Sequence, residues 1–251
     1  MRHFRFDTVD EIRRAAADAG ARHIGFLDDT QAIRATLAQK VPVGDTTVGN
    51  AIAIHPMEGC DGDADGRPSE LTWRRYQRFA RGGAKLIWFE ATAVCREGRA
   101  NPRQLWIHEG SVAEIARLVD AVRHAHREIF GSDDDLLMPV QLTHSGRFSW
   151  PKRIIAVHNP LVDRRIPTPA DQPVISDGEL ERLEDRFVDA AGLALDAGFT
   201  SVDMKATHGY LASNCSARAR GPARTADRSK IARDSSATSL ARSAQSSGDA
   251  C

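Results

Sequence analysis

The chain has 251 residues, of which 41% are hydrophobic and 27% charged, and it is long enough for one large domain or two small ones. Its 34 basic and 34 acidic residues cancel, which predicts a small-molecule partner and no nucleic acid. No apolar run approaches the roughly 18 residues of a membrane span, so we also expect no membrane partner.

Two local features predict a reducing, cytoplasmic location. The N-terminal residues MRHFRFDTVDEIRR have no apolar stretch after their basic residues, unlike a secretory signal. The four cysteines show no CxxC spacing and are too few for a disulfide framework. His124 and His126 share one expected helix without the spacing of metal ligands, so we predict no metal site.

Residues 1–47 are predicted to form a helical N-terminal segment, because Thr8 and Glu11 match a capping box. From residue 48 to residue 211, helical and strand-like patterns alternate. Short apolar runs predict strands at 51–54, 85–89, 136–142 and 201–205. Their apolar character is typical of parallel strands whose outer face is covered by helices. Pro139 cannot donate to a strand ladder, so we expect an irregularity there.

Three helices are predicted between these strands, the first over about residues 71–80. The signals that bound the helices are the pair Gly82 and Gly83, the capping boxes Ser111 with Glu114 and Ser176 with Glu179, and Gly198. Residues 143–174 hold five prolines and little periodicity, which predicts a long loop. The alternation of strands and helices predicts an α/β fold.

Unusual residues follow each predicted strand. In sequence order the motifs are HPMEG (55–59), EATAV (90–94), QLTHSGR (141–147) and KATHGYL (205–211). In parallel barrels the reacting groups lie at the carboxyl ends of the strands. These four motifs are therefore the candidates for a shared site.

Taken together and in this order, the motifs resemble those of the Old Yellow Enzyme family of NADH:flavin oxidoreductases, which are FMN-bearing TIM barrels. The resemblance covers roughly residues 48–211. It implies a partial (β/α)₈ barrel of about the first four β/α units, with FMN as cofactor and NAD(P)H as reductant.

The resemblance also implies which residues contact the cofactor. Pro56, Met57 and Ala91 would supply apolar surface and backbone polar groups to the isoalloxazine ring. Gln141 matches the family's flavin-binding glutamine, whose amide can both accept and donate at the pyrimidine edge of the ring. We interpret the neighbouring His144 and Arg147 as residues that support the loop.

His208 and Tyr210 match the end of the family's HxxHGY or HxxNGY motif. There, two side chains three residues apart bind the substrate's carbonyl oxygen, and the tyrosine donates a proton. Lys205 stands where the family has the first histidine, and Glu58 stands where it usually has Thr or Cys. The catalytic residues implied are thus Lys205, His208 and Tyr210. A purely structural alternative for Lys205 is an ion pair with Glu90.

Residues 212–251 differ in composition from the rest of the chain. Ten of these 40 residues are Ala, nine are Ser and six are Arg, which predicts disorder. Family members continue after HGYL with a YGGSxENR segment. With suitable synonymous codons, a frame that starts one base earlier at Ser213 reads ELLSARTRPGPYGGSFENRTR. We hypothesise a one-base deletion near codons 212 and 213, which leaves the tail out of frame, and sequencing the gene tests it.

The expected function is therefore hydride transfer from NAD(P)H through FMN to an activated alkene. We expect it to be impaired, because the later strands of the barrel and the family's phosphate-binding loops would be absent. One alternative is a non-catalytic half-barrel that binds or forms a homo-oligomer through its open edges. Another is a different barrel enzyme, such as a phosphate-sugar lyase with Lys205 as a Schiff base.

Overall fold

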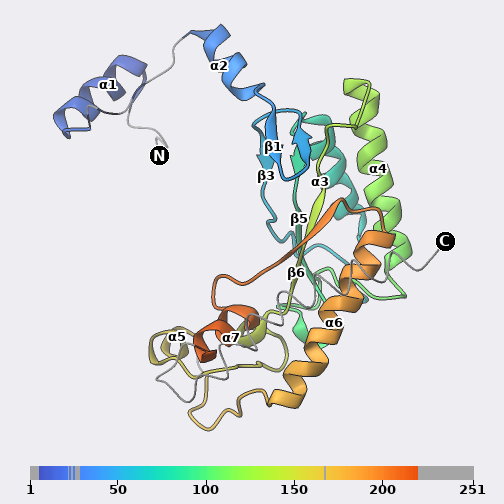
Figure 1. The fold of residues 1–251 in the computed structure, drawn as a ribbon. Helices are drawn as coiled ribbons and strands as arrows, with labels where there is room; N and C mark the ends of the chain where they lie inside the picture. The colour runs from blue at the N-terminus through green and yellow to red at the C-terminus, as the bar shows by residue number, and fades with distance from the viewer. Residues whose placement is uncertain (1–5, 22, 24, 26–28, 167, 220–251) are drawn as a thin grey trace. The chain divides into compact units, whose positions relative to one another are not determined.

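The computed structural model describes residues 6–21, 23, 25, 29–166 and 168–219. The chain divides into two compact units, Met1–Ile52 and Ala53–Cys251. The secondary structure of both units is shown in Figure 1.

Within the residues that the structure describes, the first unit contains two helices and a hairpin. The helices are α1 (Val9–Asp18) and α2 (Thr30–Leu37), and the antiparallel hairpin pairs β1 (Val41–Val43) with β2 (Thr46–Val48). Thr8 caps α1 as predicted, by accepting from the backbone N–H of Glu11 at 3.3 Å. The hairpin corrects the prediction of a purely helical segment, because β-branched residues flank the turn at Gly44, whose φ is +56°.

The second unit is built on parallel strands. They are β3 (Ala53–Ile54), β4 (Leu86–Ile87), β5 (Phe89–Ala93), β6 (Pro139–Thr143) and β7 (Ser201–Met204). β3 pairs with β4, and β6 lies between β5 and β7. Pro139 is the first residue of β6, a position where a strand tolerates proline. The predicted α/β alternation is confirmed in this unit.

The crossover helices are α3 (Glu70–Arg81), α4 (Val112–Phe130) and α6 (Asp177–Asp196). The predicted capping box of Ser176 and Glu179 is present at the start of α6. The one predicted at Ser111 is wrong, because the hydroxyl of Ser111 donates to the carbonyl of Trp106 at 2.7 Å and makes no cap hydrogen bond. α4 begins there nonetheless, since its apolar stripe packs on the strands.

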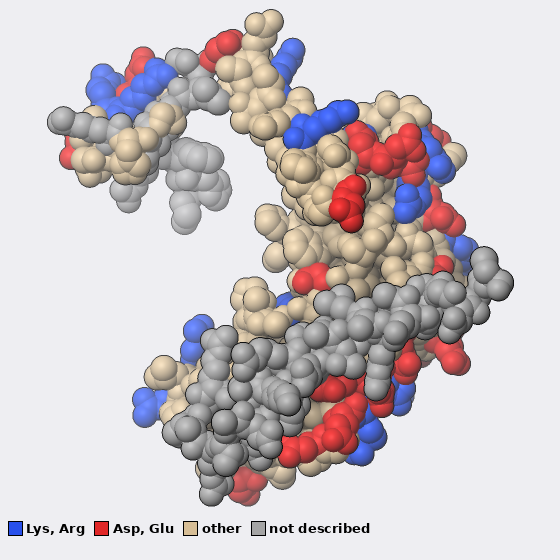
Figure 2. Space-filling view, in the orientation of Figure 1, with Lys and Arg blue, Asp and Glu red and all other residues tan. Residues whose placement is uncertain are grey.

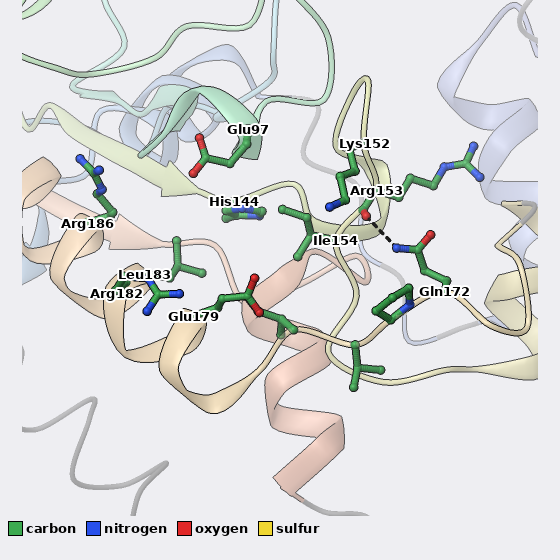
Figure 3. Close-up of a pocket in the computed structure, with 13 residues that line it drawn as sticks. Glu97, His144, Lys152, Arg153, Ile154, Gln172, Glu179, Arg182, Leu183 and Arg186 are labelled. Carbon is green, nitrogen blue, oxygen red and sulfur yellow. Dashed lines mark hydrogen bonds between the residues drawn. The ribbon is translucent and has the colours of Figure 1, made fainter.

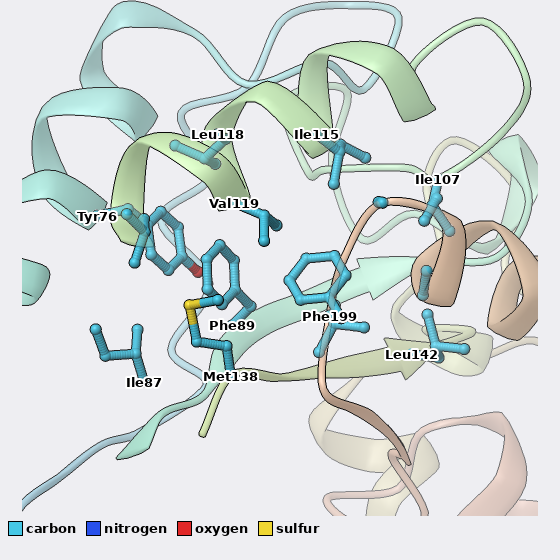
Figure 4. Close-up of a cluster of buried hydrophobic side chains, with 14 of the residues drawn as sticks. Tyr76, Ile87, Phe89, Ile107, Ile115, Leu118, Val119, Met138, Leu142 and Phe199 are labelled. Atoms are coloured by element: carbon cyan, nitrogen blue, oxygen red, sulfur yellow. The ribbon is translucent and has the colours of Figure 1, made fainter. Parts of the chain in front are cut away.

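The core lies between the strands and the three crossover helices (Figure 4). The ring of Phe89 on β5 stacks on Tyr76 of α3, with centroids 4.1 Å apart. Phe199, which precedes β7, meets Phe89 edge to face at 4.8 Å. Burial of one such side chain stabilises the fold by about 1.5–3 kcal/mol, so this cluster holds the strands in place.

The apolar side chains of β7 are more exposed than those of the neighbouring strand β6. Val202 is 37% exposed and Met204 is 50% exposed. Their register partners on β6, Val140 and Leu142, are 1% and 2% exposed. The expectation that helices cover this face of every strand is therefore wrong for β7.

Two helices lie outside the predicted elements. α5 (Pro160–Arg165) interrupts the long loop after β6, and α7 (Leu211–Ala219) begins where the disordered tail was expected. Asn214 of α7 is buried and accepts from Arg147 Nη2 at 2.8 Å. The prediction of disorder is thus wrong for residues 212–219. Residues 220–251, which hold most of the hypothetical out-of-frame tail, lie outside the described residues.

Candidate active site at the strand ends

The four motifs of the sequence lie at one end of the strands, because the strands of the second unit that carry them run parallel. HPMEG follows β3, QLT closes β6 and KATHGYL follows β7. EATAV was expected to follow a strand at 85–89, but its first four residues lie within β5, so that expectation is wrong. Hydrogen bonds between the motifs show which of their side chains meet.

Lys205 and Tyr210 meet at Glu58. One carboxylate oxygen, Oε1 of Glu58, accepts from Lys205 Nζ at 3.1 Å and from the Tyr210 hydroxyl at 3.2 Å. The side chains of Lys205 and Glu58 are only 10% and 15% exposed. The two residues that were expected to depart from the family motifs are therefore paired with each other.

Tyr210 is held by further contacts. Its ring stacks on Phe148 with centroids 5.3 Å apart, and Lys205 Nζ lies 3.9 Å from the ring centroid. Burial raises the pKa of Tyr210, and the charge and hydrogen bond of Glu58 raise it further. The phenol therefore keeps its proton near neutral pH and is available as a proton donor.

Glu90 does not pair with Lys205, which corrects that structural alternative. It is 1% exposed and forms an ion pair with Arg75 of α3 at 2.6 Å. Burial raises the pKa of Glu90, and the Arg75 guanidinium partly offsets this effect. Its other oxygen accepts from the backbone N–H of Gly59 at 2.8 Å. Glu90 thereby anchors the loop that carries Glu58 to β5.

His208 lies in a tight turn after β7. Its φ is +56°, a left-handed conformation uncommon for residues other than glycine, and the next residue, Gly209, has a φ of +75°. The side chain is exposed, and its Nδ1 lies 3.1 Å from the hydroxyl of Thr207. No hydrogen bond joins His208 to Lys205 or Tyr210.

The predicted cofactor residues differ in exposure. Gln141 is half-buried and donates to Asp203 Oδ2 at 2.7 Å, across the register pair of β6 and β7. Pro56 is half-buried, whereas Met57 is 74% exposed. Ala91 is fully buried, and its carbonyl accepts from a side-chain amide at 2.8 Å. Cofactor contact by these four residues stays a prediction.

The polar and apolar groups at the strand ends are of the types that can contact a flavin ring. Gln141 is fixed through one N–H by Asp203, and its amide still carries a second N–H and the carbonyl oxygen for the pyrimidine edge. The exposed thioether of Met57 offers apolar surface to a planar ring. The enclosed methyl group of Ala91 does not, so a contact there would involve its backbone.

Sequence reasoning missed Asp203 and the role of Glu58. Asp203 lies on β7 two residues before Lys205, which follows the strand, and this period-two spacing is a signal that could have found it. For Glu58 the signal was its charge, since an acid and a base that both depart from one pattern suggest a pair.

A cavity of about 370 Å³ lies apart from the predicted residues, between the loop after β6 and α6 (Figure 3). The charged side chains on its wall are Lys152, Arg153, Arg182, Arg186, Glu97 and Glu179. His144 also lines it, and burial lowers the pKa of His144 to about 4. None of the seven predicted site residues lines this cavity, so the candidate active site does not include it.

Arg147 supports the loop, as the sequence suggested. It is 1% exposed and forms an ion pair with Asp163 of α5, while Nη2 donates to the carbonyl of Val157 at 2.9 Å and to Asn214. Arg147 therefore connects the loop after β6 to the helix that follows Tyr210.

Charged side chains of both signs are interspersed on the face shown in Figure 2, with acidic groups gathered along α6. Among the described residues, no helix is long and apolar enough to cross a membrane. The same part of the chain holds no group of three or more His, Cys, Asp or Glu side chains placed to bind a metal.

Comparison with known proteins confirms the resemblance. A family model described as the NADH:flavin oxidoreductase / NADH oxidase family matches residues 37–216. NADPH dehydrogenases of Listeria monocytogenes (strain F2365) and Geobacillus thermodenitrificans are each 31% identical, over 175 and 170 residues. These matches cover 66% of this chain and 47% and 46% of the relatives. The chain thus spans about half the length of the curated relatives it matches.

Solved structures agree with the fold. The old yellow enzyme homologue from Zymomonas mobilis matches with a TM-score of 0.56 and 26% identity, over 70% of this chain and 50% of that one. The old yellow enzyme from Trypanosoma cruzi matches with a TM-score of 0.57 over 70% of this chain and 52% of that one. Its identity of 24% supports the fold alone.

Proposed function

Since the chain belongs to the NADH:flavin oxidoreductase / NADH oxidase family, we propose that its strand ends form part of an FMN-dependent oxidoreductase site. In this site a hydride passes from NAD(P)H through FMN to an activated alkene. The observation that supports the proposal is the meeting of Lys205 and Tyr210 at Glu58, which precedes them by 147 and 152 residues in the chain.

The residues of two motifs, QLTHSGR and HPMEG, would hold the flavin ring. Gln141, oriented by Asp203, hydrogen-bonds the polar edge, while Pro56 and Met57 provide apolar contact. When bound, FMN accepts a hydride from the nicotinamide and passes one to the substrate. The protein's part is to position the ring at the strand ends and to limit water there.

Lys205 and His208 would bind the substrate's carbonyl oxygen. Lys205 has three N–H donors, and Glu58 takes one of them. Donors placed where negative charge develops stabilise the transition state. The Tyr210 hydroxyl holds a proton across the neutral range because its pKa is raised. It can therefore supply that proton to the alkene carbon of the substrate that does not receive the hydride.

FMN titration of the purified full chain tests this proposal. We expect visible flavin absorbance to stay with the protein after gel filtration and flavin fluorescence to change on binding. Gln141→Leu should weaken binding about tenfold, which corresponds to about 1.4 kcal/mol. Gln172→Leu, in the cavity beside α6, is the matched control and should leave binding unchanged. Free FMN that never co-elutes with the chain would contradict the proposal.

A second candidate function, self-association of a half-barrel, is favoured by the edge strand β7. Among the described residues β7 pairs only with β6, and its Val202 and Met204 are exposed. A second copy of this chain could pair with that edge. Sedimentation should then show an oligomer that becomes monomeric when Val202 and Met204 are both replaced by Lys.

The lyase alternative is less well supported. A Schiff-base lysine must present a free amine to a carbonyl carbon, whereas Lys205 is engaged with Glu58 and lies against the ring of Tyr210. The geometry favours hydrogen bonding by Lys205 over covalent attack.

A further inference from the structure

We propose that Glu58 and Lys205 act as one charge-compensated unit that positions Tyr210 and makes the site select neutral carbonyl acceptors over carboxylates. The substrate preference rests on the proposed oxidoreductase function, whereas the positioning of Tyr210 does not. Glu58 and Lys205 are the two residues that the sequence led us to expect to depart from the family motifs.

The first argument is the sharing of one oxygen. Glu58 Oε1 accepts from both Lys205 and Tyr210, at 3.1 and 3.2 Å. A neutral amide at position 58 would keep the shape and lose the charge. Among the described residues, Glu58 is the acid that accepts from both the cation and the phenol.

The second argument is that the position of Glu58 is itself fixed. The adjacent Gly59 donates its backbone N–H to Glu90, and Glu90 is held by Arg75. A Cβ added at Gly59 would collide with the guanidinium of Arg75. The loop after β3 thus has no freedom to move Glu58 away from Lys205 without disturbing a buried ion pair.

The third argument is electrostatic. Alone, the ammonium of Lys205 would attract an anionic substrate, but the Glu58 carboxylate cancels its charge at a site where both side chains are at least 85% buried. Little solvent screens the repulsion between Glu58 and an incoming carboxylate. A neutral carbonyl oxygen meets no such repulsion and can still accept from the remaining N–H groups of Lys205.

Tyrosine titration tests the positioning role without any cofactor. The chain has two tyrosines, Tyr76 and Tyr210, so the tyrosinate absorbance that disappears in Tyr210→Phe belongs to Tyr210. Glu58→Gln should move this component to lower pH by about one unit, because it removes a neighbouring negative charge. Glu109→Gln, which changes an exposed acid, is the control and should move nothing. An unshifted Tyr210 titration in Glu58→Gln would overturn the positioning role.

Thermal unfolding tests the coupling between the two residues. Glu58→Gln and Lys205→Met should each lower Tm by about 2–4 °C, because each leaves a partly buried charge without its partner. The double variant should be no less stable than either single variant. Fully additive losses would contradict the idea of a single unit.

Ligand binding tests the substrate preference. Equilibrium dialysis of the FMN-loaded protein should show benzylideneacetone, a neutral enone, binding about tenfold tighter than cinnamate, the carboxylate of the same skeleton. Glu58→Gln should abolish or reverse this preference. If FMN binds and the preference is absent, or persists in Glu58→Gln, the selection of neutral acceptors is wrong. If FMN does not bind, the proposed function fails, while the tyrosine titration and the Tm cycle still decide the positioning role.

Discussion

Strands β6 and β7 are neighbours with paired apolar residues, yet only one of them is covered. Val140 and Leu142 on β6 are 1% and 2% exposed, whereas their partners Val202 and Met204 on β7 are 37% and 50% exposed. The residue types are alike and the register is regular. The comparison teaches that an apolar run predicts a strand, while its burial depends on which helices reach it.

Helix α6 contacts both strands, but the core cluster under the helices includes Val140 and Leu142 of β6 and no residue of β7. The last described helix, α7, packs near the turn that contains Phe148 and leaves the outer face of β7 open. Substitutions at register partners can therefore separate the contribution of strand pairing from that of helix cover.

The largest expected effect is at the register pair Leu142 and Met204. Leu142→Ala should lower the free energy of unfolding by about 2–5 kcal/mol, because it opens a cavity in the core. Met204→Ala should change it by no more than about 0.5 kcal/mol, since the side chain is half in solvent. Urea denaturation of both variants measures the difference. Equal losses would mean that β7 is covered in solution.

The next largest effect is on the pH dependence of stability, where His144 after β6 is compared with His208 after β7. Burial lowers the pKa of His144 to about 4, from 6.5. As the pH falls, His144 therefore binds a proton in the unfolded chain before it does so in the folded chain. The contribution of neutral His144 to the free energy of unfolding is complete above pH 6.5 and is lost as the pH drops toward 4. The loss is on the order of 3 kcal/mol.

Urea unfolding at a series of pH values checks this dependence. His144→Gln should flatten the slope between pH 6.5 and 4. His208→Gln, which removes an exposed ring, is the matched control and should keep the slope of the unmodified chain. A slope that survives the loss of His144 would assign the effect to another group.

The smallest expected loss of stability comes from a hydrogen bond between the residues that precede β6 and β7. The hydroxyl of Thr200, before β7, accepts from the backbone N–H of the buried Met138, before β6, at 2.9 Å. Thr200→Val keeps the shape but leaves this N–H without an acceptor, which should cost about 1 kcal/mol in thermal unfolding. Thr200→Ser retains the acceptor and should cost less. If both variants lose the same stability, the methyl group of Thr200 matters more than its hydroxyl.

The strands of the second unit and their order were predictable because their signals are local. Apolar runs, the Ser176 capping box and Gly198, with its φ of +89°, act within a few residues of the chain. The prediction was wrong at Ser111, where a loop carbonyl takes the hydroxyl that was expected to cap α4. That carbonyl belongs to Trp106, five residues upstream, and nothing in the capping pattern reveals it.

The residues of the candidate site were predictable from the sequence, but their hydrogen-bond and ion-pair partners were not. Lys205 and Tyr210 were identified from their motif, but Lys205 was given Glu90 as its structural alternative. Arg75 already compensates Glu90 from α3, so Lys205 pairs with Glu58 instead. The choice between two acids depended on a third residue that lies on a crossover helix.

By itself the sequence determined where the parallel strands and the three crossover helices of the second unit form, because periodicity, capping and turn chemistry operate over a few residues. The tertiary structure alone decided that Glu58 joins Lys205 to Tyr210 and that Val202 stays exposed where Val140 is buried. Ion pairing and burial depend on residues brought together from distant parts of the chain, and only packing determines those distances.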